Sequence, residues 1–272
     1  MELDALISTS GKLETLNEAR FDEYGRCIPV SLKAQVHNES RRYFSVVQPK
    51  VDYSEIYQRF DKYLAIGGQI SLGDFKQRAE AIMAFLGNLS GYENITQGVG
   101  VPFILPKSEK MDIGQAFEGT YLRGVQQSFD AMFPAHSFTS HCQSSLDGIL
   151  NITPGSRHES VINAIQKDVV VGYYFPCLLE YSKPAAIEQL ATLSDNFLLA
   201  GGFDTAAAII GSPDLLLRKD GYPPLLWLSG LEGGGEKIGY HFEAYGYDLT
   251  FNRRVHFDQA AEYWASGLVV LG

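Results

Sequence analysis

The sequence predicts an α+β fold with a mixed, largely antiparallel sheet flanked by helices. Segments with strand and helix patterns follow one another without the regular strand–helix–strand alternation of a doubly wound parallel sheet. One pair of neighbouring strand-like segments near the N-terminus is joined by a short turn-prone link, which is typical of an antiparallel hairpin. The chain has 272 residues, of which 45% are hydrophobic and 12% aromatic, enough to bury a large core.

The N-terminal part is predicted to contain this hairpin. Residues 1–20 have the pattern of a polar helix or a loose arm. Apolar and polar residues alternate over 28–36, which is the period of a half-buried strand, and His37 to Ser40 form a turn-prone link. Residues 43–51 would then be the partner strand.

Two amphipathic helices are predicted to follow the hairpin. Ser54 can cap the first helix, in which Ile56, Phe60 and Leu64 form an apolar stripe. Ser71 opens the second helix, with an acidic residue three positions later in the pattern of a capping box. Because the link between the two helices is short, we expect them to pack as antiparallel neighbours.

The middle of the chain is predicted to hold one buried strand and two helices. Residues 98–106 are a short apolar run closed by a proline. The spacing of apolar residues over 111–132 predicts a helix, although three glycines inside it each cost about 1 kcal/mol relative to alanine. Ser156 and Glu159 form a capping box for a shorter helix.

The C-terminal part has the densest strand signals. Apolar or alternating segments predict strands over 169–181, 196–200, 223–229, 237–244 and 268–271. Helices are expected to begin near Pro184, Asp204 and Asp258. The chain then divides into an N-terminal hairpin and helical region over 1–95 and a C-terminal α+β region over 96–272, or forms a single domain.

Composition and charge exclude several function classes. The net charge of −10 and the lack of a basic stripe argue against nucleic acid as a partner and against an anionic membrane surface. The first residues lack the apolar core of a signal peptide, and the most apolar run, Val169 to Leu179, is shorter than the roughly 20 residues of a bilayer span. Three widely separated cysteines do not suggest a disulfide framework. We therefore expect a soluble, acidic, cytoplasmic protein.

Histidine and cysteine gather in one polar stretch. His136, His141 and His158 lie near Cys142, and imidazole and thiolate are the ligands that zinc prefers. The spacing matches no established metal signature, so solvated loop histidines explain the same pattern. No complete cofactor-binding motif occurs, since the glycine-rich runs contain or adjoin acidic residues that repel a phosphate, and we predict no cofactor.

Two arrangements have the residue types of an active site. His241 and Glu243 lie two residues apart on a predicted strand, so they share one face and can form an acid–base pair. The solvent face of an edge strand has the same pattern. Cys142, next to His141, is a candidate nucleophile that an imidazole would activate.

Aromatic residues near the His241 strand suggest a ligand pocket. The candidate binding residues are Trp227, Tyr240, Phe242 and Tyr245, since aromatic walls with a few polar groups are typical of binding sites. Core packing is the alternative role for these side chains.

Five short segments occur in a recognisable order: QRFDKYLAIG (58–67), VPFIL (101–105), NFLLAG (196–201), PPLLWLS (223–229) and KIGYH (237–241). This pattern resembles an uncharacterised bacterial family, a domain of unknown function common in actinomycetes. The resemblance implies a bacterial cytosolic protein and assigns no activity and no catalytic residue. The sequence before the first segment and between the third and fourth departs from the pattern of that family.

The sequence thus predicts a non-catalytic protein that binds a small molecule or a protein partner. The acidic charge would suit a basic protein partner. The alternative is an enzyme of hydrolase type that uses His241 with Glu243, or Cys142 with a nearby histidine. The oligomeric state stays open.

Overall fold

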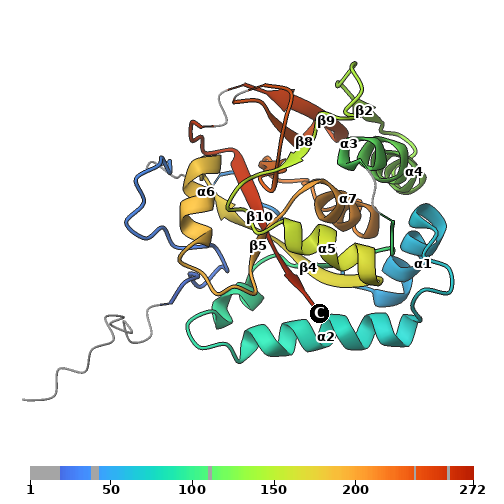
Figure 1. Cartoon of the computed structure of the whole chain (residues 1–272), viewed down its shortest axis with the longest axis horizontal. Coiled ribbons are helices and arrows are strands. Elements are labelled where there is room, and N and C mark those ends of the chain that lie inside the picture. Colours follow the sequence, from blue (N-terminus) through green and yellow to red (C-terminus); the bar gives the residue numbers. More distant parts are fainter. Residues whose placement is uncertain (1–18, 38–42, 110–111, 236, 256–257) are drawn as a thin grey trace, which may run out of the picture.

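The computed structural model describes five stretches of the chain (Figure 1): residues 19–37, 43–109, 112–235, 237–255 and 258–272. Its centre is one mixed sheet of eight strands. The strands are β1 (Val101–Leu105), β2 (Phe138–Ser140), β4 (Val170–Leu179), β5 (Leu198–Leu199), β6 (Leu225–Trp227), β8 (Gly239–Tyr245), β9 (Asp248–Arg254) and β10 (Trp264–Leu271). A separate two-stranded sheet pairs β3 (Asn151–Ile152) with β7 (Leu231–Glu232).

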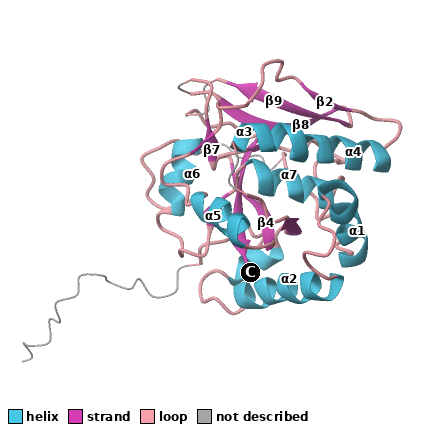
Figure 2. Cartoon of the chain, turned by 45° about the vertical axis from the view of Figure 1, so that its right-hand side comes forward, coloured by secondary structure: helices cyan, strands magenta, loops and turns pink. Residues whose placement is uncertain are grey.

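The strand order is β1-β4-β10-β6-β8-β9-β2, and β5 pairs with β10 beside this path. The β6–β10 and β2–β9 pairs are parallel, whereas the other pairs are antiparallel. Helices flank the sheet (Figure 2), so the predicted α+β class with a mixed, largely antiparallel sheet is confirmed. In both views β8, β9 and β2 lie at one end of the molecule and α2 lies at the other (Figures 1 and 2).

The helices cover the sheet and one of them lies inside the core. They are α1 (Tyr53–Leu64), α2 (Leu72–Gly87), η1 (Glu93–Gln97), α3 (Ile113–Ala116), η2 (Phe117–Leu122), α4 (Arg123–Met132), α5 (Glu159–Lys167), α6 (Lys183–Leu190) and α7 (Gly202–Gly211). Every residue of α7 is buried, and this helix packs against β1, α1 and α4. The run of alanine and isoleucine in α7 agrees with this position, because a helix that is buried on all sides needs apolar residues around its circumference.

Of the three serines predicted to cap helices, Ser71 is confirmed, whereas Ser54 and Ser156 are wrong. The N-cap of α1 is Asp52, whose side chain accepts from the backbone N–H groups of Ser54 and Glu55, and α5 begins after His158 without a side-chain cap. Ser71 accepts a hydrogen bond from the backbone N–H of Asp74 and so caps α2 as expected. At α7 the carboxylate of Asp204 accepts from the backbone N–H of Gly201 at 2.8 Å. The long helix predicted over 111–132 is present as three consecutive pieces, because residues 117–122 adopt a π-helical turn.

The predicted N-terminal hairpin is wrong. Residues 28–36 and 43–51 form no regular strands, and residues 38–42 lie outside the described part of the chain. The first segment instead packs on α6, whose Glu188 and Gln189 side chains accept its backbone N–H groups. Single bridges join Val36 to Tyr181 and Phe44 to Tyr222. The backbone of residues 28–36 contains bends, with a positive φ at Ser31, and its hydrogen-bonding partners come from elsewhere in the fold.

Two C-terminal expectations also differ from the structure. Residues 258–263 form turns rather than a helix, and the last strand begins at Trp264 rather than Leu268. The strand β9 was not predicted, although Leu249 and Phe251 alternate inward along it. Its inward residues belong to the same hydrophobic core as the buried residues of α2, so this core contains residues from both sides of position 95. The predicted division of the chain at residue 95 stays a prediction.

Among the described residues, we find no helix with the length and apolar character needed to cross a membrane.

Candidate functional site

The free edge of β4 opens beyond the end of β1. The β1–β4 ladder ends at the pair Val101 and Tyr174. Pro176 follows on β4, and since proline has no backbone N–H it cannot continue a ladder. Pairing on this side resumes at Cys177, whose carbonyl accepts from the backbone N–H of Cys27 at 3.0 Å. A gap therefore separates β1 from the N-terminal segment along the edge of β4.

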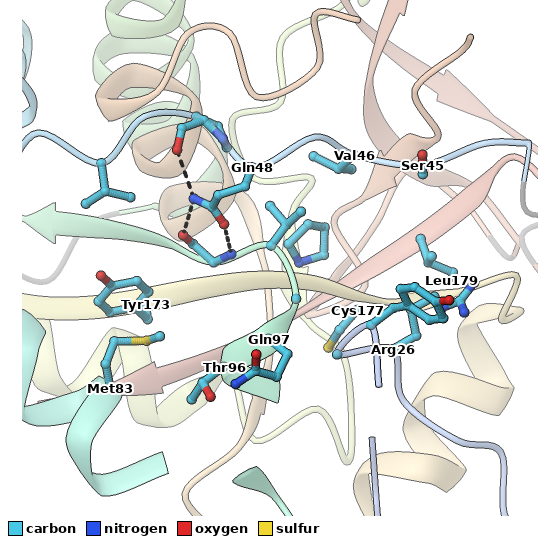
Figure 3. A pocket seen from close by; sticks show the side chains of 18 of the residues that line it. Arg26, Ser45, Val46, Gln48, Met83, Thr96, Gln97, Tyr173, Cys177 and Leu179 are labelled. Atoms are coloured by element: carbon cyan, nitrogen blue, oxygen red, sulfur yellow. Dashed lines mark hydrogen bonds between the residues drawn. The ribbon is translucent and has the colours of Figure 1, made fainter. Parts of the chain in front are cut away.

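An extended segment that we call the strap, residues 43–51, crosses this gap. The Gln48 side chain fixes it to the end of β1 (Figure 3). Its Oε1 atom accepts from the Gly100 backbone N–H at 2.8 Å, and its Nε2 atom donates to the Gly100 carbonyl at 3.0 Å. One carboxamide thus satisfies both backbone groups of Gly100, as a neighbouring strand would.

On the other side of the gap, a close backbone contact between two glycines holds the N-terminal segment in place. Gly25 has a φ of +72°, and a Cβ atom built on it would lie 2.4 Å from the backbone nitrogen of Gly98. Only glycine fits a left-handed position this close to another backbone. The contact fixes the N-terminal segment against the loop that follows η1.

Strap, loop and strand together line an open-sided cavity of about 900 Å³ (Figure 3). This volume lies within the range of about 300–1,000 Å³ that is typical of small-molecule sites. Its apolar lining includes Val46, Val51, Met83, Val99, Tyr173 and Leu179. The lining exposes nearly as much polar as apolar surface, a combination that suits a ligand with groups of both kinds.

Arg26 is the one charged side chain among the described residues that line the cavity, and it is already neutralised. Its guanidinium lies 2.8 Å from the carboxylate of Asp22 and stacks 4.8 Å from the ring centre of Tyr24. Burial raises the pKa of the lining thiol Cys177 well above its usual value of 9.0. At neutral pH the cavity therefore carries no unpaired charge.

The predicted pair His241 and Glu243 is formed, but in another part of the sheet. The Nε2 atom of His241 lies 3.2 Å from a carboxylate oxygen of Glu243, which also accepts from Arg254 at 3.1 Å. Burial lowers the pKa of His241 despite the carboxylate, so the imidazole is neutral at pH 7. The His241 hydrogen bond lowers the pKa of Glu243, with a further contribution from Arg254.

The His241 imidazole is sealed from solvent. It has 0% exposure, and the ring of Trp227 lies edge-on to it at 5.0 Å. A base must reach within hydrogen-bonding distance of the proton that it removes. Because neither His241 nor Glu243 lines the cavity, this pair has no access to a ligand bound there.

Cys142 lies half-buried in the loop after β2. Burial raises the pKa of its thiol to about 11, and its charged neighbours are Arg253 and Glu118 rather than an imidazole. A thiol that stays protonated at neutral pH is a poor nucleophile.

The structure does not bring His136, His141 and His158 together. His158 is buried in the core, where its Nδ1 atom lies 3.1 Å from the carbonyl of Leu199. The ring of His136 lies beside Tyr247, and the backbone of His141 pairs with β9. Within the described ranges, no group of three or more His, Cys, Asp or Glu residues can hold a metal ion.

The four aromatic candidates do not share one pocket. Tyr240 and Phe242 are buried on one face of β8, where both pack on Phe251. Trp227 packs on the opposite face beside His241, and Tyr245 is 81% exposed near the end of the strand. Three of them thus serve core packing in this structure.

Sequence reasoning missed the cavity because its walls come from segments far apart in the chain. Comparison with protein-family models, with curated proteins and with solved structures finds no match for this chain. The resemblance to a bacterial family of unknown function therefore stays a prediction.

Proposed function

We propose that this chain is a cytoplasmic small-molecule-binding protein whose site is the cavity beneath the strap. The observation that carries the proposal is a cavity of about 900 Å³ with a mixed polar and apolar lining, whose described residues carry no unpaired charge. The three cysteines are free thiols, which agrees with a reducing compartment.

Binding without catalysis is favoured by what lines the cavity. Its described lining has no carboxylate and no imidazole, and its thiol, Cys177, is protonated at neutral pH. General acid–base or nucleophilic catalysis needs such a group in contact with the substrate. The hydrolase alternative therefore has no supporting geometry in this cavity.

A thermal-shift screen of a small-molecule library tests the proposal, with two neighbouring strap residues as a matched pair. Val46 lines the cavity, whereas Val47 is 55% exposed and does not. A ligand at 100 times its Kd stabilises the protein by about 2.7 kcal/mol. We expect hits whose stabilisation is lost in Val46→Trp, which fills the cavity, and retained in Val47→Trp.

Two results would contradict the proposal. One is a set of hits that stabilise Val46→Trp as well as they stabilise the wild type. The other is a library without hits alongside a protein partner that binds both variants equally, since this would favour the protein-binding interpretation.

A further inference from the structure

We propose that the cavity beneath the strap takes an uncharged ligand that has an apolar group at one end and polar groups beside it. This inference rests on the proposed function and names the chemical class of the ligand. It follows from the charge, the polar groups and the layout of the lining.

The charge balance of the lining disfavours an ionic ligand. An anion would need Arg26, but the Nε and Nη2 atoms of this residue are both held by the Asp22 carboxylate, at 2.9 Å and 2.8 Å. A cation would need a free carboxylate, and the described lining has none. Burying a charge without an oppositely charged partner costs desolvation free energy that no new interaction offsets.

Asp22 is itself firmly positioned. Its second oxygen accepts the backbone N–H groups of Tyr24 and Arg26, each at 2.9 Å. These bonds hold the carboxylate in place, so an incoming anion would have to compete with a preorganised ion pair for the guanidinium.

Among the described lining residues, the exposed Gln97 side chain is available to a ligand. The Tyr173 hydroxyl is paired with that of Tyr53, and the Thr96 hydroxyl donates to the carbonyl of Glu93. The Gln97 carboxamide makes no hydrogen bond within the part of the chain that the structure describes. It offers one donor and one acceptor group to a neutral polar partner.

The lining residues at the two ends of the cavity differ in chemistry (Figure 3). Met83 and Tyr173 lie at one end, Arg26 and Leu179 lie at the other, and Gln97 lies between them. The described lining residues at the Met83 end carry no charge, so the apolar group of the ligand belongs there. Methionine adapts to irregular apolar shapes, which suits a contact with an aliphatic or aromatic group.

Two fluorescent probes that differ by one charge test this class. Phenylnaphthylamine is neutral, and anilinonaphthalene sulfonate has the same aromatic skeleton with an added sulfonate. We expect the neutral probe to bind the wild type at least about tenfold more tightly than the anionic probe, a difference of about 1.4 kcal/mol. Val46→Trp should abolish binding of the neutral probe, whereas Val47→Trp should not.

Asp22→Asn then tests the role of the ion pair. Asparagine keeps an oxygen for the backbone N–H groups of Tyr24 and Arg26 but removes the charge that neutralises Arg26. We expect the anionic probe to gain about tenfold in affinity, while the neutral probe is unchanged. Glu23→Gln removes one exposed negative charge from the next position and should change neither probe.

The outcomes separate this inference from the proposed function. If the anionic probe binds as tightly as the neutral one, and Val46→Trp blocks both, the site is confirmed and the uncharged class is wrong. If Glu23→Gln raises the affinity of the anionic probe as much as Asp22→Asn does, the effect is one of net charge and the role given to the ion pair is wrong. If neither probe shows binding that depends on Val46, the inference and the proposed function fail together.

Discussion

Two regions of this protein differ in their chemistry and in their access to solvent. The cluster around His241 and Glu243 contains ionisable groups in contact, yet its imidazole is fully buried. The strap cavity has space for a ligand, yet Arg26, the one charged residue in the described part of its lining, is neutralised. In the sheet, β8 and β4 are separated by β6 and β10, which corresponds to about 14 Å.

The comparison shows that residues of the types found in active sites are not always placed where a ligand can contact them. A histidine beside a carboxylate is a catalytic arrangement only when a substrate can contact it. Here Glu243 bonds to both His241 and Arg254 at the edge of an aromatic cluster, which includes Trp227 and Trp264 at 5.1 Å. We infer that the His241 cluster stabilises the sheet and that the strap cavity binds the ligand.

The largest expected effect comes from the aromatic cluster. Trp227 is 2% exposed, so Trp227→Ala should lower the free energy of unfolding by about 3–5 kcal/mol. Urea unfolding measures this change. Phenylnaphthylamine should bind the remaining folded protein with an affinity within about twofold of the wild type, because distant sites act independently.

An aromatic contact connects the two regions, so the prediction that Trp227→Ala leaves probe binding unchanged can fail. The ring of Phe44, in the strap, lies 5.7 Å from that of Tyr263, which packs on Trp264. A large loss of probe affinity in Trp227→Ala would mean that the cluster shapes the cavity through this contact, and the two roles would not be separate.

A smaller effect is expected at the strap. Gln48→Ala removes both bonds to Gly100 and should lower the free energy of unfolding by about 1 kcal/mol. It should weaken probe binding by about tenfold, because the cavity loses the group that fixes its cover. Gln58→Ala, which loses one exposed bond to Ser54, is the control and should leave binding unchanged. Equal losses in both variants would contradict the role of Gln48.

The smallest effect concerns pH. Burial holds the pKa of His241 below its usual value of 6.5, so below about pH 6.5 the unfolded chain takes up a proton that the folded chain does not. Stability should fall as the pH drops from there, and Glu243 should add a further loss below its usual pKa of 4.5. Urea midpoints of the wild type and His241→Gln across this range measure the first part. Parallel pH dependence in the two proteins would show that His241 does not contribute.

Local signals in the sequence predicted much of the fold. The cap of α2 at Ser71 and the strand β4 were predicted correctly. Both depend on residues that are close together in the sequence. The prediction of an N-terminal hairpin failed because alternation over 28–36 does not indicate the partner of this segment, which is α6. Pairing between distant segments depends on tertiary packing, which short windows do not contain.

The candidate site could be predicted only in part. Period-2 geometry was enough to place His241 and Glu243 together, since both lie on one strand. The cavity needs Gln48, Gly98 and Pro176 to meet, and nothing in their spacing indicates this. The available signal was Pro176 within an otherwise apolar strand, because proline interrupts a ladder and marks a place where pairing ends.

The most direct test of this account is hydrogen–deuterium exchange with and without phenylnaphthylamine. The account predicts that the probe slows exchange in the strap and in residues 96–100, with no change in β8 and β9. Protection of β8 and β9 around His241 and Glu243, with the strap unaffected, would contradict it and would make the buried cluster the binding site.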